Sequence, residues 1–174
     1  HLIRDAAGKY TLPLTSSPEI HNNELDAWLD SLSNYDLALL RFLYEALIEL
    51  APAVCPEDLP IWENIYRDLP EPAVNESGFM LTANESLQES HRHFSHLMSV
   101  FPLNQCQYNR STEERKRIDD SIRTLEHLGR GEWVGFSFAW MAEIYAKAYN
   151  GEGAAYQLKG FFEHLCSQNG FHLN

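Results

Sequence analysis

The chain is dominated by segments whose apolar residues recur every three or four positions, the spacing of one face of an α-helix. Residues 33–52 begin with Ser33, a residue type that caps helix N-termini, and end at Pro52, which disfavours further helix. Residues 60–70 repeat this pattern between two prolines. The sequence therefore predicts two helices in its first half, with prolines marking their ends.

The second half of the chain contains three more helical patterns. Residues 112–128 follow Ser111, which has the spacing of a capping box with Glu114, and they precede a glycine. One face of this helix is apolar and the other is charged. Residues 136–149 are apolar almost all round, whereas residues 152–166 are amphipathic again. We therefore expect the helix at 136–149 to be more buried than the helix at 112–128.

These patterns predict an all-α fold in which helical hairpins form an inner and an outer layer. Strand is expected only near residues 71–89, where Pro72, Gly78 and a brief apolar run suit a loop with at most one short β-hairpin. No fixed period of about 30 to 45 residues recurs, so the sequence does not support a regular helical repeat array. A binding solenoid of helix pairs is kept as the rival architecture.

Composition argues against several classes of function. The net charge of −12 would repel a phosphate backbone, so we expect no nucleic-acid partner. No apolar run approaches the ~18 residues of a membrane span, so we expect no membrane partner either. The cysteines Cys55, Cys106 and Cys166 lie far apart and form no CxxC pair. They are interpreted as free or buried thiols.

The most unusual segment is "SHRHFSHLMSVFPLN", residues 90–104, with three histidines and one arginine within six positions. Its apolar spacing predicts a helix, and these polar residues lie at the N-terminal end of that helix. On that helix His93 and His96 would lie about 60° apart and His91 nearly opposite His93, so the three imidazoles could not share one face. No cysteine or acidic residue lies within the segment, so zinc is disfavoured and we expect neither a metal nor a cofactor. Two roles stay open: structural hydrogen bonding, or binding of a ligand rich in hydroxyl groups.

This segment resembles the His-Arg-His-x-Ser-His-Leu segment of glycoside hydrolase family 95, the α-L-fucosidase and α-L-galactosidase group. Two further stretches match in the same order. "TSSPE", residues 15–19, resembles the Ser-Pro-Glu segment of that family, and "WVGFSFAWMAEIYAKAYNGEGAAYQL", residues 133–158, resembles its Gly-Trp-Ser-x-Ala-Trp helix with the turn that follows. The resemblance implies the C-terminal part of a catalytic domain built as a six-hairpin α/α toroid. We therefore expect residues 1–174 to form a single domain that is a fragment of this larger domain.

The resemblance also implies a mechanism. Members of the family invert the anomeric centre: a carboxylic acid protonates the leaving oxygen, while an asparagine assisted by an aspartate orients water. Glu19 matches the acid. As an alternative, it is a loop carboxylate whose negative charge interacts favourably with the N-terminus of the helix that follows. The family segment Phe-x-Ile-Asp-Gly aligns with "GFHLN", which places Asn174 where the aspartate would stand. The expected substrate-binding residues are His91, Arg92, His93, His96 and Asn174.

From this resemblance we expect a glycoside hydrolase that removes terminal sugars from glycans, in a secreted or periplasmic protein. A sugar must reach both Glu19 and the histidine segment, so we expect them around one concavity. An incomplete toroid would leave apolar edges uncovered, which predicts contact with the remainder of the domain or self-association. We also expect this chain by itself to be inactive. The alternative is a non-catalytic helical domain that binds glycans or protein.

Overall fold

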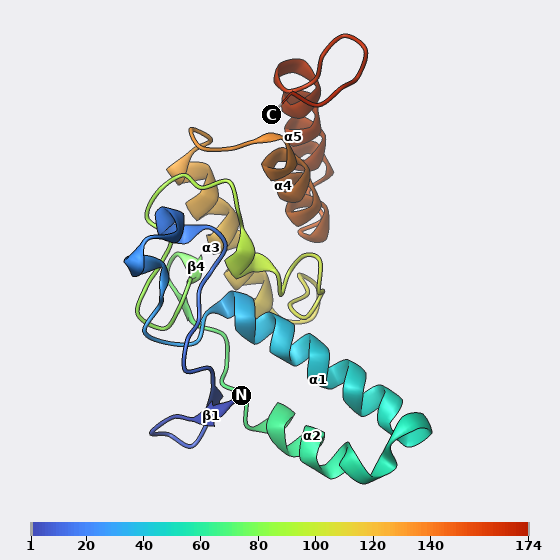
Figure 1. Ribbon diagram of the computed structural model, residues 1–174. Coiled ribbons are helices and arrows are strands. Elements are labelled where there is room, and N and C mark those ends of the chain that lie inside the picture. The colour runs from blue at the N-terminus through green and yellow to red at the C-terminus, as the bar shows by residue number, and fades with distance from the viewer. Residues whose placement is uncertain (1, 174) are drawn as a thin grey trace.

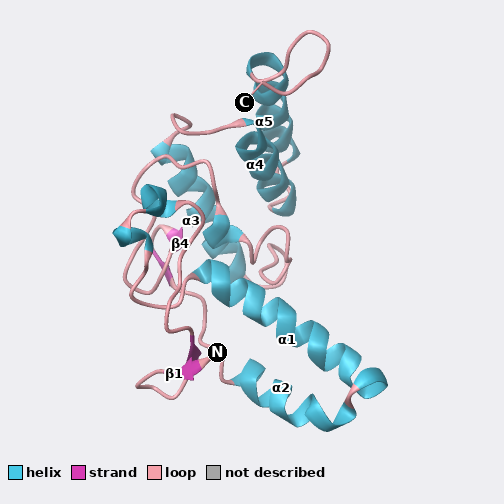
Figure 2. Ribbon diagram, in the orientation of Figure 1, coloured by secondary structure: helices cyan, strands magenta, loops and turns pink. Residues whose placement is uncertain are grey.

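The computed structural model describes residues 2–173, except for the side chain of Asn23, and is mainly helical (Figures 1 and 2). The two main helical hairpins are α1 with α2 and α4 with α5, whose members pack against each other. This arrangement confirms the expected all-α class. The helices are α1 (Asn34–Val54), α2 (Leu59–Arg67), α3 (Thr112–Leu128), α4 (Gly135–Lys147) and α5 (Gly151–His164).

Side-chain caps begin three of these helices. The Ser33 hydroxyl accepts the backbone N–H of Asp36 at 3.0 Å, and the Ser111 hydroxyl accepts that of Glu114 at 3.1 Å. At α5, Asn150 accepts the N–H of Gly153 at 2.8 Å. These bonds satisfy N–H groups that have no partner within the helix.

Two expectations about helix ends are wrong. Helix α1 continues two residues beyond Pro52, to Val54. A proline removes only its own N–H bond, and the backbone N–H of Cys55 still donates to the carbonyl of Ala51 at 3.0 Å. At α3 the capping box is only half formed, because the Glu114 carboxylate turns away from Ser111 and accepts the N–H of Gln107 at 2.5 Å.

The short hairpin expected within residues 71–89 is confirmed as β3 (Val74–Asn75) and β4 (Gly78–Phe79), which pair antiparallel. It lies against α3, where the N–H of Phe79 donates to the Ser121 hydroxyl at 2.9 Å. Gly78 has a φ of +91°, and a Cβ there would lie 2.5 Å from the backbone nitrogen of Ser121. Only glycine suits this position, because any side chain would meet the helix.

A second hairpin, β1 (Ile3–Arg4) with β2 (Tyr10–Thr11), corrects the expectation of at most one. Its turn is built locally: the Asp5 carboxylate accepts the N–H of Ala7 at 2.9 Å and that of Lys9 at 2.8 Å. The Arg4 guanidinium lies 4.1 Å from the centre of the Tyr10 ring. The strands have two residues each, too few for a period-two pattern to be recognised in the sequence.

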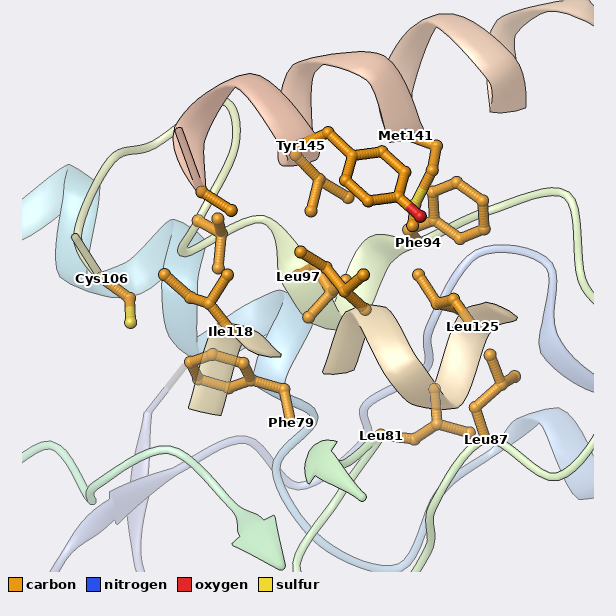
Figure 3. Packing of buried hydrophobic residues seen from close by; sticks show 14 of the residues in the cluster. Phe79, Leu81, Leu87, Phe94, Leu97, Cys106, Ile118, Leu125, Met141 and Tyr145 are labelled. Carbon is orange, nitrogen blue, oxygen red and sulfur yellow. The ribbon is translucent and has the colours of Figure 1, made fainter. Parts of the chain in front are cut away.

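The hydrophobic core lies where α3 and α4 meet the segments between residues 79 and 106 (Figure 3). Helix α4 has seven buried residues among 13, against five among 17 in α3, which confirms the predicted order of burial. Burial of α4 is not complete, since Phe136 is 42% exposed. The largest fully buried apolar side chains are Leu81, Phe94, Leu97, Val100, Ile118, Met141 and Ile144.

Helices α1, α2 and α5 keep apolar side chains on their outer surfaces. In Figure 1 the α1–α2 hairpin extends away from the core region. Among the described residues, no helix combines the length and apolar character needed to cross a membrane. The exposed apolar residues of these helices include Phe42, Leu43, Leu50, Ile61, Tyr156, Leu158 and Phe162.

Candidate functional site

The histidine segment has a different backbone from the one expected. Residues 93–101 do not form an α-helix; only Ser95–Leu97 form a short 3-10 turn, followed by further turns. Phe94, Leu97 and Val100 are each at most 1% exposed, so burial of these side chains in the core outweighs regular backbone hydrogen bonding. The face-by-face argument for the histidines, which assumed a helix, therefore does not apply.

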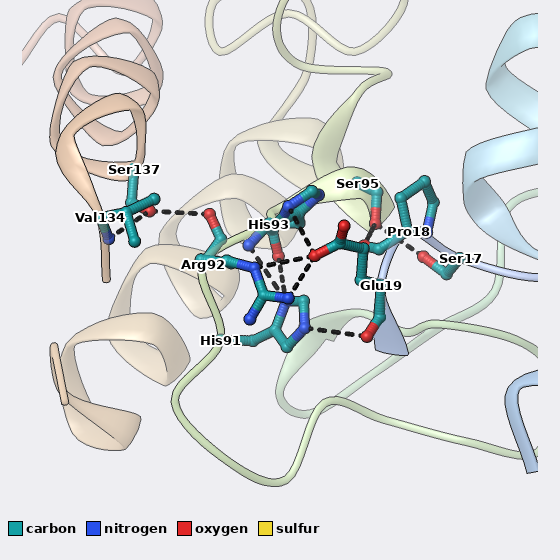
Figure 4. Close-up of polar contacts among 9 residues, drawn as sticks. All are labelled: Ser17, Pro18, Glu19, His91, Arg92, His93, Ser95, Val134 and Ser137. Carbon is teal, nitrogen blue, oxygen red and sulfur yellow. Dashed lines mark hydrogen bonds and ion pairs between the residues drawn. The ribbon is translucent and has the colours of Figure 1, made fainter. Parts of the chain in front are cut away.

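Two buried serines hold the loop that carries Glu19 against this segment. The hydroxyl groups of Ser17 and Ser95 are hydrogen-bonded at 2.6 Å, and Ser95 donates to the carbonyl of Pro18 at 3.3 Å. Both serines are at most 3% exposed. The backbone immediately before Glu19 is thereby fixed beside the histidine segment (Figure 4).

The side chain of Glu19 meets Arg92 directly. Nε of Arg92 donates to Oε2 of Glu19 at 2.8 Å, and Nη2 donates to the same oxygen. The carbonyl of Arg92 accepts the Ser137 hydroxyl at 2.8 Å, and Ser137 in turn accepts the N–H of Val134 at 3.1 Å. Figure 4 shows these contacts joining the Glu19 loop, the histidine segment and the start of α4.

His91 and His93 complete the cluster around Glu19. Nδ1 of His91 accepts the N–H of His93 at 3.0 Å, so the proton of a neutral His91 ring is on Nε2, which lies 3.4 Å from the Glu19 carbonyl. Nε2 of His93 lies 3.5 Å from Oε2 of Glu19. The His93 ring also packs edge-on against Phe136, with ring centres 5.2 Å apart. Both rings therefore have fixed orientations.

Arg92 and burial determine the charges of Glu19 and His93. The hydrogen bonds and positive charge of Arg92 lower the pKa of the Glu19 carboxyl below its usual value. Burial lowers the pKa of His93, although the Glu19 carboxylate acts in the opposite direction. At neutral pH Glu19 is therefore ionised and His93 is neutral, and their contact is not an ion pair.

The remaining predicted site residues are placed differently. His96 is 4% exposed, its pKa is lowered by burial to about 4, and its Nδ1 has no hydrogen-bond partner among residues 2–173. It is a neutral, buried ring, and it makes no hydrogen bond or ion pair with Glu19. Asn174 lies outside the described residues.

Sequence reasoning singled out the charged and aromatic members of the site and missed the serines that hold them. Ser17 and Ser95 were within the quoted motifs, which could have marked them as structural partners of Glu19. Ser137 also lay within a quoted motif, residues 133–158, but its bond to the Arg92 carbonyl depends on the start of α4 lying beside Arg92.

The cluster presents one carboxylate and one guanidinium that remain reachable from solvent, with side chains 41% exposed for Glu19 and 32% for Arg92. Such a pair can accept and donate hydrogen bonds to a polar ligand. Within residues 2–173 no three histidine, cysteine or acidic side chains gather closely enough to hold a metal ion.

Comparison with known families gives a match that covers the whole chain. The family described as the glycosyl hydrolase family 95 catalytic domain matches residues 1–174. No curated protein matches the chain.

Proposed function

The chain belongs to glycosyl hydrolase family 95, a family of glycoside hydrolases, and on this premise we propose that it removes terminal α-L-fucosyl-type sugars from glycans with inversion. The observation that carries the proposal is the contact of Glu19 with the segment from His91 to His93, about 72 positions away in the sequence. A carboxyl group, a guanidinium and two imidazoles there suit a ligand with many hydroxyl groups.

In the proposed reaction Glu19 donates a proton to the glycosidic oxygen while the bond from that oxygen to the anomeric carbon breaks. A water molecule attacks the anomeric carbon from the opposite face and gives its proton to a base on that side. His91, Arg92, His93 and His96 are proposed to form the sugar-binding wall. Asn174 is proposed to contact the substrate from the chain's final segment.

The ion pair with Arg92 imposes a condition on this mechanism. An acid must carry its proton, and Arg92 favours the ionised form of Glu19. We propose that sugar hydroxyl groups take over the donors of Arg92, so that the pKa of Glu19 rises in the complex. Because Ser137 holds the Arg92 carbonyl, only the side chain needs to move.

The direct test is Glu19→Gln in the full-length protein, because residues 1–174 alone are expected to be inactive; the change keeps the size of the side chain and removes its acid. We expect turnover of an α-L-fucoside to fall about 10²- to 10⁴-fold with little change in melting temperature. Glu24→Gln, at an exposed neighbouring position, is the matched control and should keep full activity. If Glu19→Gln retained more than about a tenth of the activity, the assignment of the acid would be wrong.

A second candidate function is glycan binding without chemistry. It is favoured by the ionised Glu19 paired with Arg92, because a binding site needs no proton on that carboxyl. This alternative predicts saturable binding of a fucosylated oligosaccharide with no turnover. Product formation that depends on Glu19 would exclude it.

We further propose that the α1–α2 and α4–α5 hairpins belong to a six-hairpin toroid and that residues 1–174 are part of one catalytic domain. The apolar side chains exposed on these hairpins support the proposal, because uncovered apolar surface of this kind marks contact regions. Either the remainder of the domain or a second copy would cover them. From the substrate class we propose a secreted or periplasmic location.

A further inference from the structure

A second polar cleft lies away from the candidate site. It has a volume of about 320 Å³ and is bounded by α1, α2, β4, the loop at residues 99–106 and the start of α3. None of Glu19, His91, Arg92 and His93 is in its wall. This volume is at the lower end of the range for small-molecule sites, roughly 300 to 1,000 Å³, and would hold one monosaccharide-sized ligand.

Several residues that line this cleft have buried polar atoms without a hydrogen-bond partner. Six buried side-chain nitrogen or oxygen atoms in the described residues have no hydrogen-bond partner. Three of them, Arg41 Nε, Ser99 Oγ and Gln105 Oε1, belong to residues that line this one cleft. Buried polar groups in proteins are almost always satisfied, so three such atoms on residues of one wall point to a ligand that supplies missing partners.

The charged groups of the wall are mostly paired within the protein. Nη1 of Arg110 donates to Glu114 at 3.1 Å, and Nη2 of Arg41 lies 3.6 Å from Glu71. By contrast, the half-buried guanidinium of Arg117 makes no hydrogen bond or ion pair with any residue from 2 to 173. Arg117 is therefore the group in the cleft that is ready to receive an anion.

From this arrangement we infer that the cleft binds a small hydroxylated carboxylate, such as a uronic acid, as a site separate from the Glu19 cluster. The carboxylate pairs with Arg117. One hydroxyl group of the ligand donates to Gln105 Oε1, and another contacts the Ser99 hydroxyl. The three unpartnered atoms are buried, so binding requires the Ser99 hydroxyl and the Gln105 amide to turn towards the cleft. For Gln105 this turn breaks the 2.9 Å hydrogen bond from Nε2 to the Ala38 carbonyl.

D-glucuronate is the probe that tests this inference, by NMR titration of the amide signals of the protein. We expect saturable shifts at Ser99, Gln105 and Arg117. D-glucose, which lacks the carboxylate, and acetate, which lacks the hydroxyl groups, should each bind at least about tenfold more weakly, because each omits one part of the recognition.

Arg117→Gln should weaken glucuronate binding about tenfold, whereas Arg115→Gln, on the same helix but outside the cleft, should change it less than about twofold. Ser99→Ala is a second variant that removes an unpartnered hydroxyl without opening a large cavity, and it should also weaken binding. Equal binding by Arg117→Gln, equal binding of acetate, or no saturable shifts would each overturn the inference. Shifts confined to residues 91–95 and lost in Glu19→Gln would also overturn it, because they would assign the probe to the candidate active site.

Discussion

Glu19 illustrates how a neighbouring residue decides the chemistry of a carboxyl group. The Arg92 pair keeps Glu19 ionised in the free protein, so the residue proposed as the acid carries no proton at neutral pH. The pKa in the folded state is lowered, so the stabilisation from this pair is present above the pKa of the unfolded state and is lost as the pH falls. Proton donation therefore depends on what Arg92 contacts.

Arg92→Met should raise the pKa of Glu19, because the change removes both hydrogen bonds and the positive charge. The measurement is an NMR titration of the labelled Glu19 carboxyl carbon. Arg4→Met, which breaks the separate pair with Asp68, is the control and should leave the midpoint of Glu19 unchanged. An unchanged midpoint in Arg92→Met would show that Arg92 does not set the protonation of Glu19.

His96 should make the protein less stable in mild acid. Its pKa is about 4 in the folded protein, because burial disfavours the charged ring, against about 6.5 when unfolded. Between these values only the unfolded state binds the proton, so the free energy of unfolding falls as the pH falls from about 6.5 to 4, by up to about 3 kcal/mol.

Urea unfolding at several pH values between 4.5 and 7 measures this loss. His96→Asn should flatten the pH dependence, while the exposed control His127→Asn should keep it. His93 contributes in the same direction, since its pKa is also lowered, so some dependence will persist in His96→Asn. The same slope in His96→Asn and the unchanged protein would contradict the account.

At the scale of single residues, the motifs indicated which residues lie near Glu19, but the helix expected for the histidine segment is not formed. Glu19 and the segment from His91 to His93 do meet, although residues 93–101 were expected to be helical. The serine contacts and the lowered pKa of Glu19 depend on distances between segments far apart in the sequence. A periodic pattern of residues predicts local structure, and it does not predict distances between such segments.

At the scale of elements, helices with side-chain caps were predictable and turns held by tertiary contacts were not. The patterns beginning at Ser33 and Ser111 correspond to α1 and α3, since a cap and an apolar stripe are both local signals. The N-terminal hairpin was missed because its strands have two residues each and are held by distant Asp68. The Asp68 carboxylate pairs with Arg4 at 2.9 Å, and its carbonyl accepts the N–H of Tyr10 at 3.0 Å.

The docking of the β3–β4 hairpin on α3 gives a test at this scale. Gly78→Ala should destabilise the protein by about 1–3 kcal/mol, because alanine at positive φ is strained and its Cβ would collide with the backbone of Ser121. Gly131→Ala has no heavy atom within 4 Å of its new Cβ and should be nearly neutral. Thermal or urea unfolding of the two variants compares them, and equal stabilities would refute the close packing of Gly78.

At the scale of the whole molecule, the exposed apolar faces of α1, α2 and α5 predict association. Each square ångström of apolar surface removed from water is worth about 25 cal/mol, so several hundred Å² of cover contributes several kcal/mol. The chain should therefore sediment as larger species, and melt at higher temperature, as its concentration rises.

Phe162→Lys, at a position 64% exposed on α5, should shift the sedimentation distribution towards monomer. Glu163→Lys, on the same helix, adds the same charged side chain without removing apolar surface and should shift it less. A monomer with a concentration-independent melt would contradict the proposal that these faces are contact regions.

The chain belongs to the family and is mostly helical. The proposed function depends on Glu19 supplying the proton to the leaving group. Glu19→Gln in the full-length protein should be compared on two fucosides, one with an acidic phenol as leaving group and one with an alcohol. A phenolate departs without a proton, whereas an alkoxide needs one in the transition state.

The decisive measurement is therefore the ratio of the losses in kcat/KM for these two substrates when Glu19 is replaced by glutamine. The account predicts a loss at least about 10²-fold greater for the alcohol leaving group than for the phenol. Equal losses for the two substrates would contradict it, because they would mean that Glu19 binds or positions the sugar without protonating the departing oxygen.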